Sequence, residues 1–251
     1  LKVVEGRPDG LIARYKMLGQ WTFGISLGLF LLFHPISPVP PNHTMVPFFS
    51  DIALVFHPWA YVLFVGFIIS GSSNAVNITD GLDGLAAGLT AIAAATFAVF
   101  AYLMGRADYS EYLGLFYLPG AGELSVLALG LAGGCLGFLW YNAHPAEVFM
   151  GDTGSLALGG AVGVMAILLK AEFLLAIVGG VFVLEMLSVI LQVGYFRYTA
   201  KKHGTGRRLF RMAPIHHHFE QLGWSESKIV VRFWIMGILC AMVAFSALKI
   251  R

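Results

Sequence analysis

Side chains able to bind a metal ion or a phosphate crowd the segment 73–88, whose sequence is SNAVNITDGLDGLAAG. It carries the amides of Asn74 and Asn77 and the carboxylates of Asp80 and Asp83 between two long apolar stretches. The structural alternative is a helix cap, but one cap needs a single side-chain oxygen. Polar groups at a membrane boundary are costly unless they bind something polar, and Mg²⁺ prefers carboxylate and amide oxygens. The segment therefore predicts a metal-binding site, to which capping contributes.

A second acidic segment, 141–155, has the sequence YNAHPAEVFMGDTGS and also leads into an apolar stretch. Asp152 lies between two glycines, where it is either a second helix cap or a second site carboxylate. The ring of Phe149 either anchors at the membrane interface or stacks on a planar ligand such as a nucleobase. The free N–H groups of the helix that follows would favour a phosphate.

Three consecutive histidines, His216, His217 and His218, lie in the most basic loop of the chain. Adjacent residues point in different directions and nothing nearby completes a tetrahedral set, so zinc is not expected. Hydrogen bonding to phosphate oxygens suits these side chains better. The basic residues of the loop are expected to orient the protein and to meet anionic lipid. They are Lys201, Lys202, Arg207, Arg208 and Arg211.

One carboxylate, that of Glu185, lies in the middle of an apolar stretch, with Ser188 and Gln192 each about one helical turn further along. An intramembrane carboxylate should face the interior of a helix bundle and often lines a site. Gln192 lies at the end of the stretch that approaches the motif segments. It is therefore the better candidate for contact with a substrate.

These segments must be positioned by membrane-spanning helices, because the composition excludes a soluble domain. The 251 residues are 58% hydrophobic and only 12% charged, whereas about a quarter of a soluble domain is charged. A bilayer core needs roughly 20 apolar residues per helix, and isolated strands cannot span it. The prediction is an all-α membrane protein with seven transmembrane helices, the fifth and sixth joined in a tight hairpin. Their ranges are 17–33, 52–69, 85–104, 124–140, 156–169, 173–192 and 229–248.

Seven spans place the three motif segments on one side of the bilayer. The same side carries most of the lysines and arginines, so the positive-inside rule makes it cytoplasmic. The opposite side receives the segment 34–51, whose five prolines predict an extended, stiff connection. Cys135 and Cys240 lie inside apolar stretches and are expected to form neither a disulfide nor a metal site.

Together, the segments 74–84, 149–155 and 214–220 resemble the polyprenyl-phosphate N-acetylhexosamine-1-phosphate transferase superfamily, and the resemblance covers essentially the whole chain. Within it, the run PIHHHFE is most similar to the phospho-N-acetylmuramoyl-pentapeptide transferases. The resemblance implies a ten-helix fold, in which the seven spans correspond to helices four to ten. The family motif Asp-Asp-x-x-Lys precedes helix four, so Lys2 is matched to its lysine and the two aspartates are expected upstream of Leu1. We expect one catalytic membrane domain, 1–251, truncated at its N-terminus.

The same resemblance implies roles for individual residues. Asp152 is matched to the Mg²⁺ ligand, with Asn77 beside it, and Asp80 to an acidic residue near the metal and the pyrophosphate. Phe149 is matched to the ring that stacks on uracil. The implied catalytic residues are Lys2, Asp80, Asp152, His216 and His217. The implied substrate-binding residues are Asn74, Asn77, Asp83, Phe149, Gln192 and His218.

The implied reaction is the Mg²⁺-dependent transfer of phospho-MurNAc-pentapeptide from UDP-MurNAc-pentapeptide to undecaprenyl phosphate, which forms lipid I and UMP in peptidoglycan synthesis. The implied location is the bacterial cytoplasmic (inner) membrane, with the active site facing the cytoplasm. Membrane lipid is a partner, nucleic acid is not, and a homodimer is left open. Three alternatives remain: a related transferase that uses UDP-GlcNAc, a membrane transporter, and a non-catalytic scaffold. A transporter is less well supported, because only Glu185 lies deep in a span.

Overall fold

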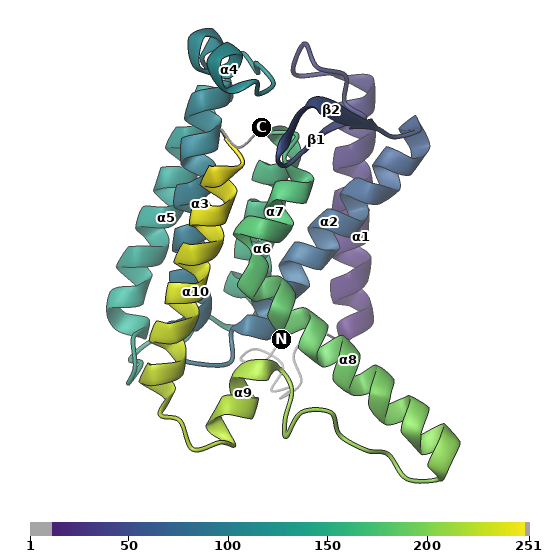
Figure 1. The fold of residues 1–251 in the computed structure, drawn as a ribbon, viewed down its shortest axis with the longest axis vertical. Coiled ribbons are helices and arrows are strands. Elements are labelled where there is room, and N and C mark those ends of the chain that lie inside the picture. The colour runs from purple at the N-terminus through teal and green to yellow at the C-terminus, as the bar shows by residue number, and fades with distance from the viewer. Residues whose placement is uncertain (1–11, 249–251) are drawn as a thin grey trace.

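The computed structural model describes residues 12–248, which form a bundle of helices that run up and down along one axis (Figure 1). Two short strands and a short helix lie at the upper end of the bundle (Figure 1). The order of the elements is α1 (Ala13–Phe33), β1 (His43–Val46), β2 (Phe49–Val55), α2 (Pro58–Thr79), α3 (Leu85–Met104), α4 (Ala107–Leu113), α5 (Ala121–Asn142), α6 (Gly151–Leu168), α7 (Glu172–Val178), α8 (Gly180–His203), α9 (Ile215–Glu220) and α10 (Glu226–Ser246).

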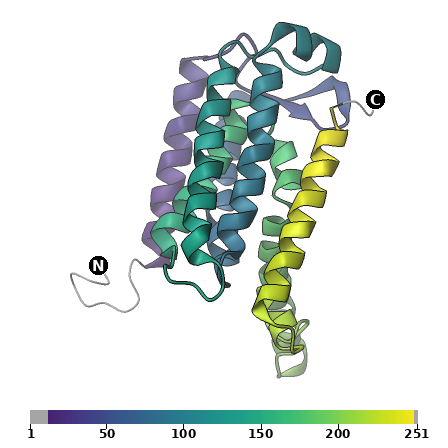
Figure 2. The same ribbon diagram turned by 90° about the vertical axis from the view of Figure 1, so that its left-hand side faces the viewer.

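Seven of the described helices are long and apolar enough to cross a membrane, which confirms the prediction of an all-α membrane protein. They are α1, α2, α3, α5, α6, α8 and α10. Successive spans alternate in direction, so the chain returns repeatedly to the lower end of the bundle (Figures 1 and 2). We call this lower end the inner end and the opposite end the outer end.

Both predicted boundaries of the second span are wrong. Residues 52–55 lie in β2, and α2 begins only at Pro58, because a proline is well suited to the first turn of a helix. The helix then continues to Thr79 through a segment that was expected to be a loop. Asn74 and Asn77 are therefore helical side chains, three residues apart on α2.

The predicted sixth span is divided at Gly179 into α7 and α8. The helix α8 leaves the bundle at an oblique angle and extends past the inner ends of the other helices (Figure 1). The inner loop expected from residue 193 therefore starts as helix and turns at Gly204, where φ is 77°. The turn between α6 and α7 spans only residues 169–171, which confirms the tight hairpin of the fifth and sixth stretches.

The outer connection before α2 contains an antiparallel hairpin of β1 and β2, so the prediction of an extended connection is wrong. Contacts with the α6–α7 turn hold the hairpin in place. Thr44 donates a hydrogen bond to the carboxylate of Glu172, and the N–H of Met45 donates to the carbonyl of Lys170 at 2.8 Å. The Nζ of Lys170 in turn donates to the carbonyl of Pro41 at 2.8 Å. Thr44, Lys170 and Glu172 are buried, so their polar groups need partners within the protein. These long-range bonds therefore stabilise the hairpin.

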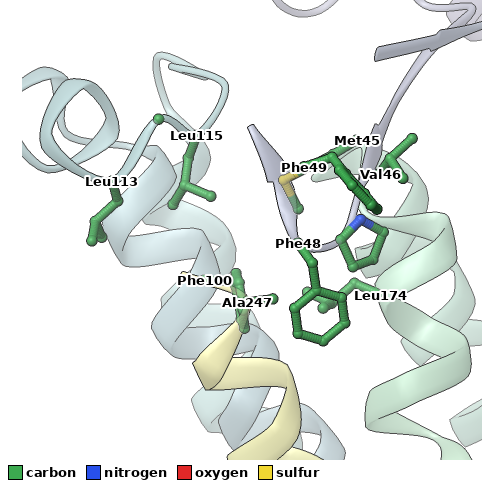
Figure 3. A pocket seen from close by; sticks show the side chains of 11 residues that line it. Met45, Val46, Phe48, Phe49, Phe100, Leu113, Leu115, Leu174 and Ala247 are labelled. Atoms are coloured by element: carbon green, nitrogen blue, oxygen red, sulfur yellow. The ribbon is translucent and has the colours of Figure 1, made fainter. Parts of the chain in front are cut away.

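A small cavity lies beneath this hairpin (Figure 3). Met45, Phe48, Phe100 and Leu174 are among the side chains that line it. Its volume is about 20 Å³, room for about one water molecule. This outer cavity is therefore too small for a substrate.

A close contact between α2 and α6 sets the place of the inner motifs. A Cβ on Gly159 would lie 2.4 Å from the carbonyl oxygen of Ser72, so glycine is what allows the two backbones to approach. Ser73 donates a hydrogen bond to the carbonyl of Leu156 at 3.0 Å. One turn further along α2, Asn77 reaches the first turn of α6.

Candidate active site

The three motif segments meet at the inner end of the bundle, as the alternation of spans predicts. They are the α2–α3 turn at 80–84, the α5–α6 connection at 143–150, and the segment 204–225 that contains α9 (Figure 1). The basic residues predicted to orient the protein lie at the end of α8 and in the same segment. The site therefore lies where the bundle would meet the inner membrane surface.

Asp152 lies in the first turn of α6 and contacts two other helices. Its Oδ1 accepts a hydrogen bond from the Nδ2 of Asn77 on α2 at 3.1 Å, and its Oδ2 lies 2.5 Å from the Nζ of Lys16 on α1. The same amide nitrogen of Asn77 donates to the hydroxyl of Ser155 at 2.9 Å. The N-cap position of α6 is Met150, and no side-chain hydrogen bond caps this helix. The Asp152 carboxylate, in the first turn of α6, therefore joins this helix to α1 and α2.

Asp80 directly follows α2 and lies close enough to Asp152 for their charges to interact. Burial, and then the negative charge of Asp152, raise the pKa of Asp80 from 3.8 to about 6. Asp80 does not cap the next helix, whose N-cap is Gly84 with φ of 77°. Two carboxylates that repel each other are stabilised by a shared cation. Asp80 and Asp152 therefore bring two carboxylates into mutual electrostatic influence, and carboxylate oxygens are ligands that divalent cations prefer.

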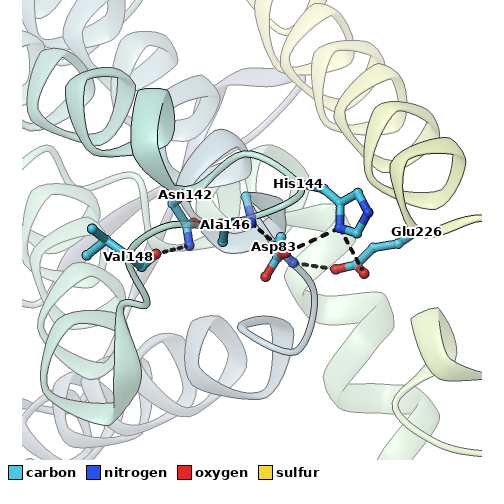
Figure 4. Close-up of polar contacts among 7 residues, drawn as sticks. Asp83, Asn142, His144, Ala146, Val148 and Glu226 are labelled. Carbon is cyan, nitrogen blue, oxygen red and sulfur yellow. Dashed lines mark hydrogen bonds and ion pairs between the residues drawn. The ribbon is translucent and has the colours of Figure 1, made fainter.

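A second polar group joins three inner segments (Figure 4). The Oδ2 of Asp83 accepts a hydrogen bond from the N–H of Ala146 at 3.0 Å and lies 3.3 Å from the Nδ1 of His144. The same Nδ1 lies 3.2 Å from Glu226 Oε2, while Glu226 Oε1 accepts the N–H of Asp83 at 2.7 Å. One ligand atom from each of Asp83, His144 and Glu226 lies within 4.8 Å of the others, so the group could also hold a metal ion. With or without an ion, it ties the α2–α3 turn to the α5–α6 connection and to the start of α10.

The α5–α6 connection also presents an exposed aromatic ring. The side chain of Phe149 is 74% exposed. Its loop is held by Asn142, whose Nδ2 donates to the carbonyl of Val148 at 2.8 Å (Figure 4). The Oδ1 of Asn142 also accepts the N–H of Gly84 at 3.1 Å. A fixed loop with an exposed ring is suited to stacking on a planar ligand.

His216 is the most deeply buried of the three histidines. Its side chain and that of Glu185 on α8 are both fully buried, with His216 Nδ1 3.1 Å from Glu185 Oε2. A Cβ on Gly81 would lie 2.4 Å from His216 Nε2, so the ring packs directly against the α2–α3 turn. His216 therefore lies behind that turn rather than on the surface of the site.

The other two histidines are partly exposed and hydrogen-bonded within their own segment. The Nδ1 of His217 bonds with the carboxylate of Glu220, one turn further along α9. The Nδ1 of His218 accepts the N–H of Arg211 at 3.1 Å. Of the three rings, His217 and His218 remain the ones that a ligand can reach.

Asn74 and Gln192, which were predicted to bind substrate, form hydrogen bonds within the protein. The Nδ2 of Asn74 donates to Gln20 Oε1 at 2.7 Å and so links α2 to α1. The Oε1 of Gln192 accepts the N–H groups of Leu209 and Phe210 at 3.0 and 2.9 Å. Its Nε2 donates to the carbonyl of Phe210 at 3.2 Å. Both amides thus position neighbouring segments in this structure.

An apolar cavity of about 300 Å³ lies in the membrane-spanning part of the bundle, among α2, α6, α7 and α8. Val76 and Met186 are among the side chains that line it. Because Val76 is one helical turn before Asp80, the cavity approaches the carboxylates from the membrane interior. A lipid chain fits such surroundings.

Three polar residues at the site were not predicted from the sequence: Lys16, His144 and Glu226. A lysine at the inner end of a span is an ordinary topology signal, and an acidic residue in the first turn of a helix is an ordinary dipole partner. Neither pattern distinguishes a site residue. Lys2, which was predicted to be catalytic, lies outside the described residues and stays a prediction.

Comparison with known proteins identifies the family. Residues 9–170 match the family model of glycosyl transferase family 4. The phospho-N-acetylmuramoyl-pentapeptide-transferase of Gemmatimonas aurantiaca is 57% identical over 256 residues, which cover 98% of this chain and 67% of that protein. The proteins of the same name from Chloroherpeton thalassium and Chlorobium phaeobacteroides are 51% and 50% identical, over all of this chain and 68% of theirs. The chain therefore belongs to glycosyl transferase family 4 and, within it, to the phospho-N-acetylmuramoyl-pentapeptide-transferases.

Proposed function

We propose that the inner-end site transfers phospho-MurNAc-pentapeptide from UDP-MurNAc-pentapeptide to undecaprenyl phosphate in a Mg²⁺-dependent reaction. The names of the relatives support the transferred group. The observation that carries the proposal is that the Asp80 and Asp152 carboxylates influence each other at the inner end of the bundle, where Asp80 lies one helical turn after Val76, which lines an apolar cavity. A water-soluble nucleotide and a lipid phosphate can meet at such a place.

In the proposed reaction, an oxygen of the lipid phosphate attacks the sugar-linked phosphorus of the nucleotide substrate. The bond from that phosphorus to the bridging oxygen breaks, UMP leaves with the electron pair, and lipid I forms. When bound, Mg²⁺ supplies positive charge beside the bridging phosphates. Asp152 and Asp80 would hold it together with the amide oxygen of Asn77. The ammonium of Lys16, 2.5 Å from Asp152, lies where it can stabilise negative charge that develops on the phosphates.

The nucleoside is proposed to bind at the α5–α6 connection. The exposed ring of Phe149 would stack on uracil, and Asp83, on the adjoining turn, would accept hydrogen bonds from the nucleoside. The lipid chain would occupy the cavity among α2, α6, α7 and α8, with its phosphate directed to the end that Val76 lines. By the positive-inside rule, this site faces the cytoplasm of a bacterial cell.

The test is formation of lipid-linked product by the full-length protein, including the residues expected upstream of Leu1, from UDP-MurNAc-pentapeptide and undecaprenyl phosphate at a series of Mg²⁺ concentrations. We expect product only with the metal, and little or none when UDP-GlcNAc replaces the donor. An equal or higher rate with UDP-GlcNAc would instead support the related hexosamine transferase. Undiminished activity in EDTA would refute the proposed metal dependence.

Two pairs of variants assign the residues. Asp152→Asn should lower kcat about 100-fold or more, because it removes one charge from the metal-binding set. Asp108→Asn, at an exposed position on α4 at the outer end, should leave the rate unchanged.

Phe149→Leu should raise KM for the nucleotide donor about 5- to 100-fold through lost stacking. Phe149→Tyr keeps an aromatic ring, so its KM should be close to that of the wild type. Full activity of Asp152→Asn, or a Phe149→Leu variant with unchanged KM, would contradict these roles.

A further inference from the structure

The helix α8 has two faces of opposite character. Phe182, Met186 and Ile190 follow one another at helical spacing and line the apolar cavity. Glu185, Ser188 and Gln192 are three and four residues apart, so they share a separate, polar face. That polar face is directed toward the segment 204–221, because two of its three side chains contact that segment. The helix thus separates the proposed lipid cavity from the histidine segment.

The first contact is buried deep in the bundle. The side chains of Glu185 and His216 have no exposed surface. The Nδ1 of His216 lies 3.1 Å from the Oε2 of Glu185, but the angles between the two groups are not those of a hydrogen bond. Neither ring nitrogen of His216 has a hydrogen-bond partner among the described residues. The residues next to this pair in the chain, Met186 and Ile215, pack against one apolar cluster that includes Val181 and Phe233. Removal of either group would leave the other buried without a polar partner, which would be strongly destabilising.

The second contact is made at the inner end of α8. The Gln192 amide makes three hydrogen bonds with the backbone of Leu209 and Phe210, which satisfies both ends of the side chain. The next residue, Arg211, donates its N–H to the Nδ1 of His218. The bonds therefore lead from α8 through this short stretch of backbone to a histidine of α9.

We propose that Glu185 and Gln192 are positioning residues that fix the histidine segment on α8, Glu185 through the ring of His216 and Gln192 through the backbone of Leu209 and Phe210. The ring of His216 then packs between α8 and the α2–α3 turn, where its Nε2 contacts Gly81, the residue after Asp80. Two anchors, 7 residues apart in α8, hold His217 and His218 at the site. This inference rests on the proposed function, since it concerns the place of those rings in the same reaction.

The first test is Gln192→Leu in the full chain, with Gln192→Glu as the conservative variant. We expect Gln192→Leu to lower kcat about 10- to 100-fold through misplacement of the segment, and to change KM for UDP-MurNAc-pentapeptide less than about 3-fold. Gln192→Glu keeps an oxygen that can accept from Leu209 and Phe210 but loses the Nε2 donor to the Phe210 carbonyl, so its kcat should lie between those of Gln192→Leu and the wild type. A large rise in KM with unchanged kcat would overturn the proposal, because it would mean that Gln192 contacts the nucleotide directly.

The second test compares Glu185→Gln, His216→Asn and the double variant. If the two residues act as one unit, the double variant should be no slower than the slower single variant. Additive losses would overturn the pairing. Ser188→Ala is the matched control on the same face, because its hydroxyl bonds only with the carbonyl of Glu185 within α8, and it should leave kcat unchanged.

Hydrogen exchange separates this inference from the proposed function, because it needs no substrate. Amide exchange in segment 209–221 should rise at least about 10-fold in Gln192→Leu, and in Glu185→Gln if that variant folds, while the outer hairpin keeps its wild-type protection. Unchanged exchange in Gln192→Leu would overturn the anchoring role. Failure of the wild type to form lipid-linked product would instead count against the proposed function, whatever the exchange data show.

Discussion

Replacing Asp80 by asparagine should stabilise the metal-free protein while it removes the activity. Burial and the charge of Asp152 raise the pKa of Asp80 from 3.8 to about 6, so the folded state binds this proton more tightly than the unfolded state. Stability is therefore greatest below the unfolded pKa and falls as the pH rises through about 6. The shift is worth about 3 kcal/mol at most, and about 1 kcal/mol once solvent screening of this partly exposed group is allowed for. Asparagine keeps the size of the side chain and removes the charge.

The assay is thermal unfolding of the full chain in detergent with EDTA, at pH 4 and at pH 8. We expect the midpoint of Asp80→Asn to exceed that of the wild type by about 2–4 °C at pH 8 and by less at pH 4. Added Mg²⁺ should stabilise the wild type more than the variant, because the variant lacks one of the carboxylates of the proposed metal site. Transfer activity should fall about 100-fold or more.

Asp108→Asn provides the control for the sign of this effect. Hydrogen bonding to Arg106 lowers the pKa of Asp108, so its contribution is present at neutral pH and is lost as the pH falls. The variant should therefore show no gain at pH 8. The reasoning is refuted if Asp80→Asn lowers the midpoint at pH 8, or if its gain is the same at both pH values. Either result would mean that Asp80 does not lie buried beside the charge of Asp152.

Two further substitutions test the framework that holds the site. Gly159→Ala would place a methyl group 2.4 Å from a backbone oxygen of α2, and should cost about 1–3 kcal/mol in stability together with most of the activity. Gly194→Ala, whose Cβ would meet nothing within 4 Å, should be neutral or gain up to about 1 kcal/mol in the same unfolding assay. Thr44→Val removes the hydroxyl that bonds the buried carboxylate of Glu172, and should cost about 1–3 kcal/mol while KM for the nucleotide donor stays unchanged. A Thr44→Val variant that changed KM would contradict the separation of the outer and inner ends.

Most of the spans could be predicted because the length of an apolar stretch is a local property of the sequence. The prediction for the second and sixth spans failed where tertiary contacts override composition. The stretch before Pro58 is apolar, yet it forms β2, because the hairpin is completed by bonds from Thr44 and Met45 to the α6–α7 turn. Nothing near residue 44 in the sequence indicates that a turn 126 residues later will supply those partners.

The candidate site could be predicted as a set of segments but not as a set of contacts. The sides of the membrane follow from counting spans, so Asp80 and Asp152 were expected at one end. Their mutual influence, and the approach of Lys16 to Asp152, depend on how α1, α2 and α6 pack. The environments of the three histidines could not be predicted either, because adjacent residues on α9 face in different directions once the helix docks on α8.

The sequence alone determined that the chain has helices able to cross a membrane and that its polar motifs gather at one end of them, because hydrophobicity, charge and side-chain chemistry belong to residues individually. The same side-chain chemistry predicts binding of a metal ion and phosphates. Only the tertiary structure decided which of these groups meet. In that structure His216 is buried against Gly81 and Glu185, Gln192 accepts hydrogen bonds from the backbone of the histidine segment, and Phe149 is exposed. The reason is that burial and pairing arise from contacts between segments far apart in the chain, and those contacts exist only once the helices have packed.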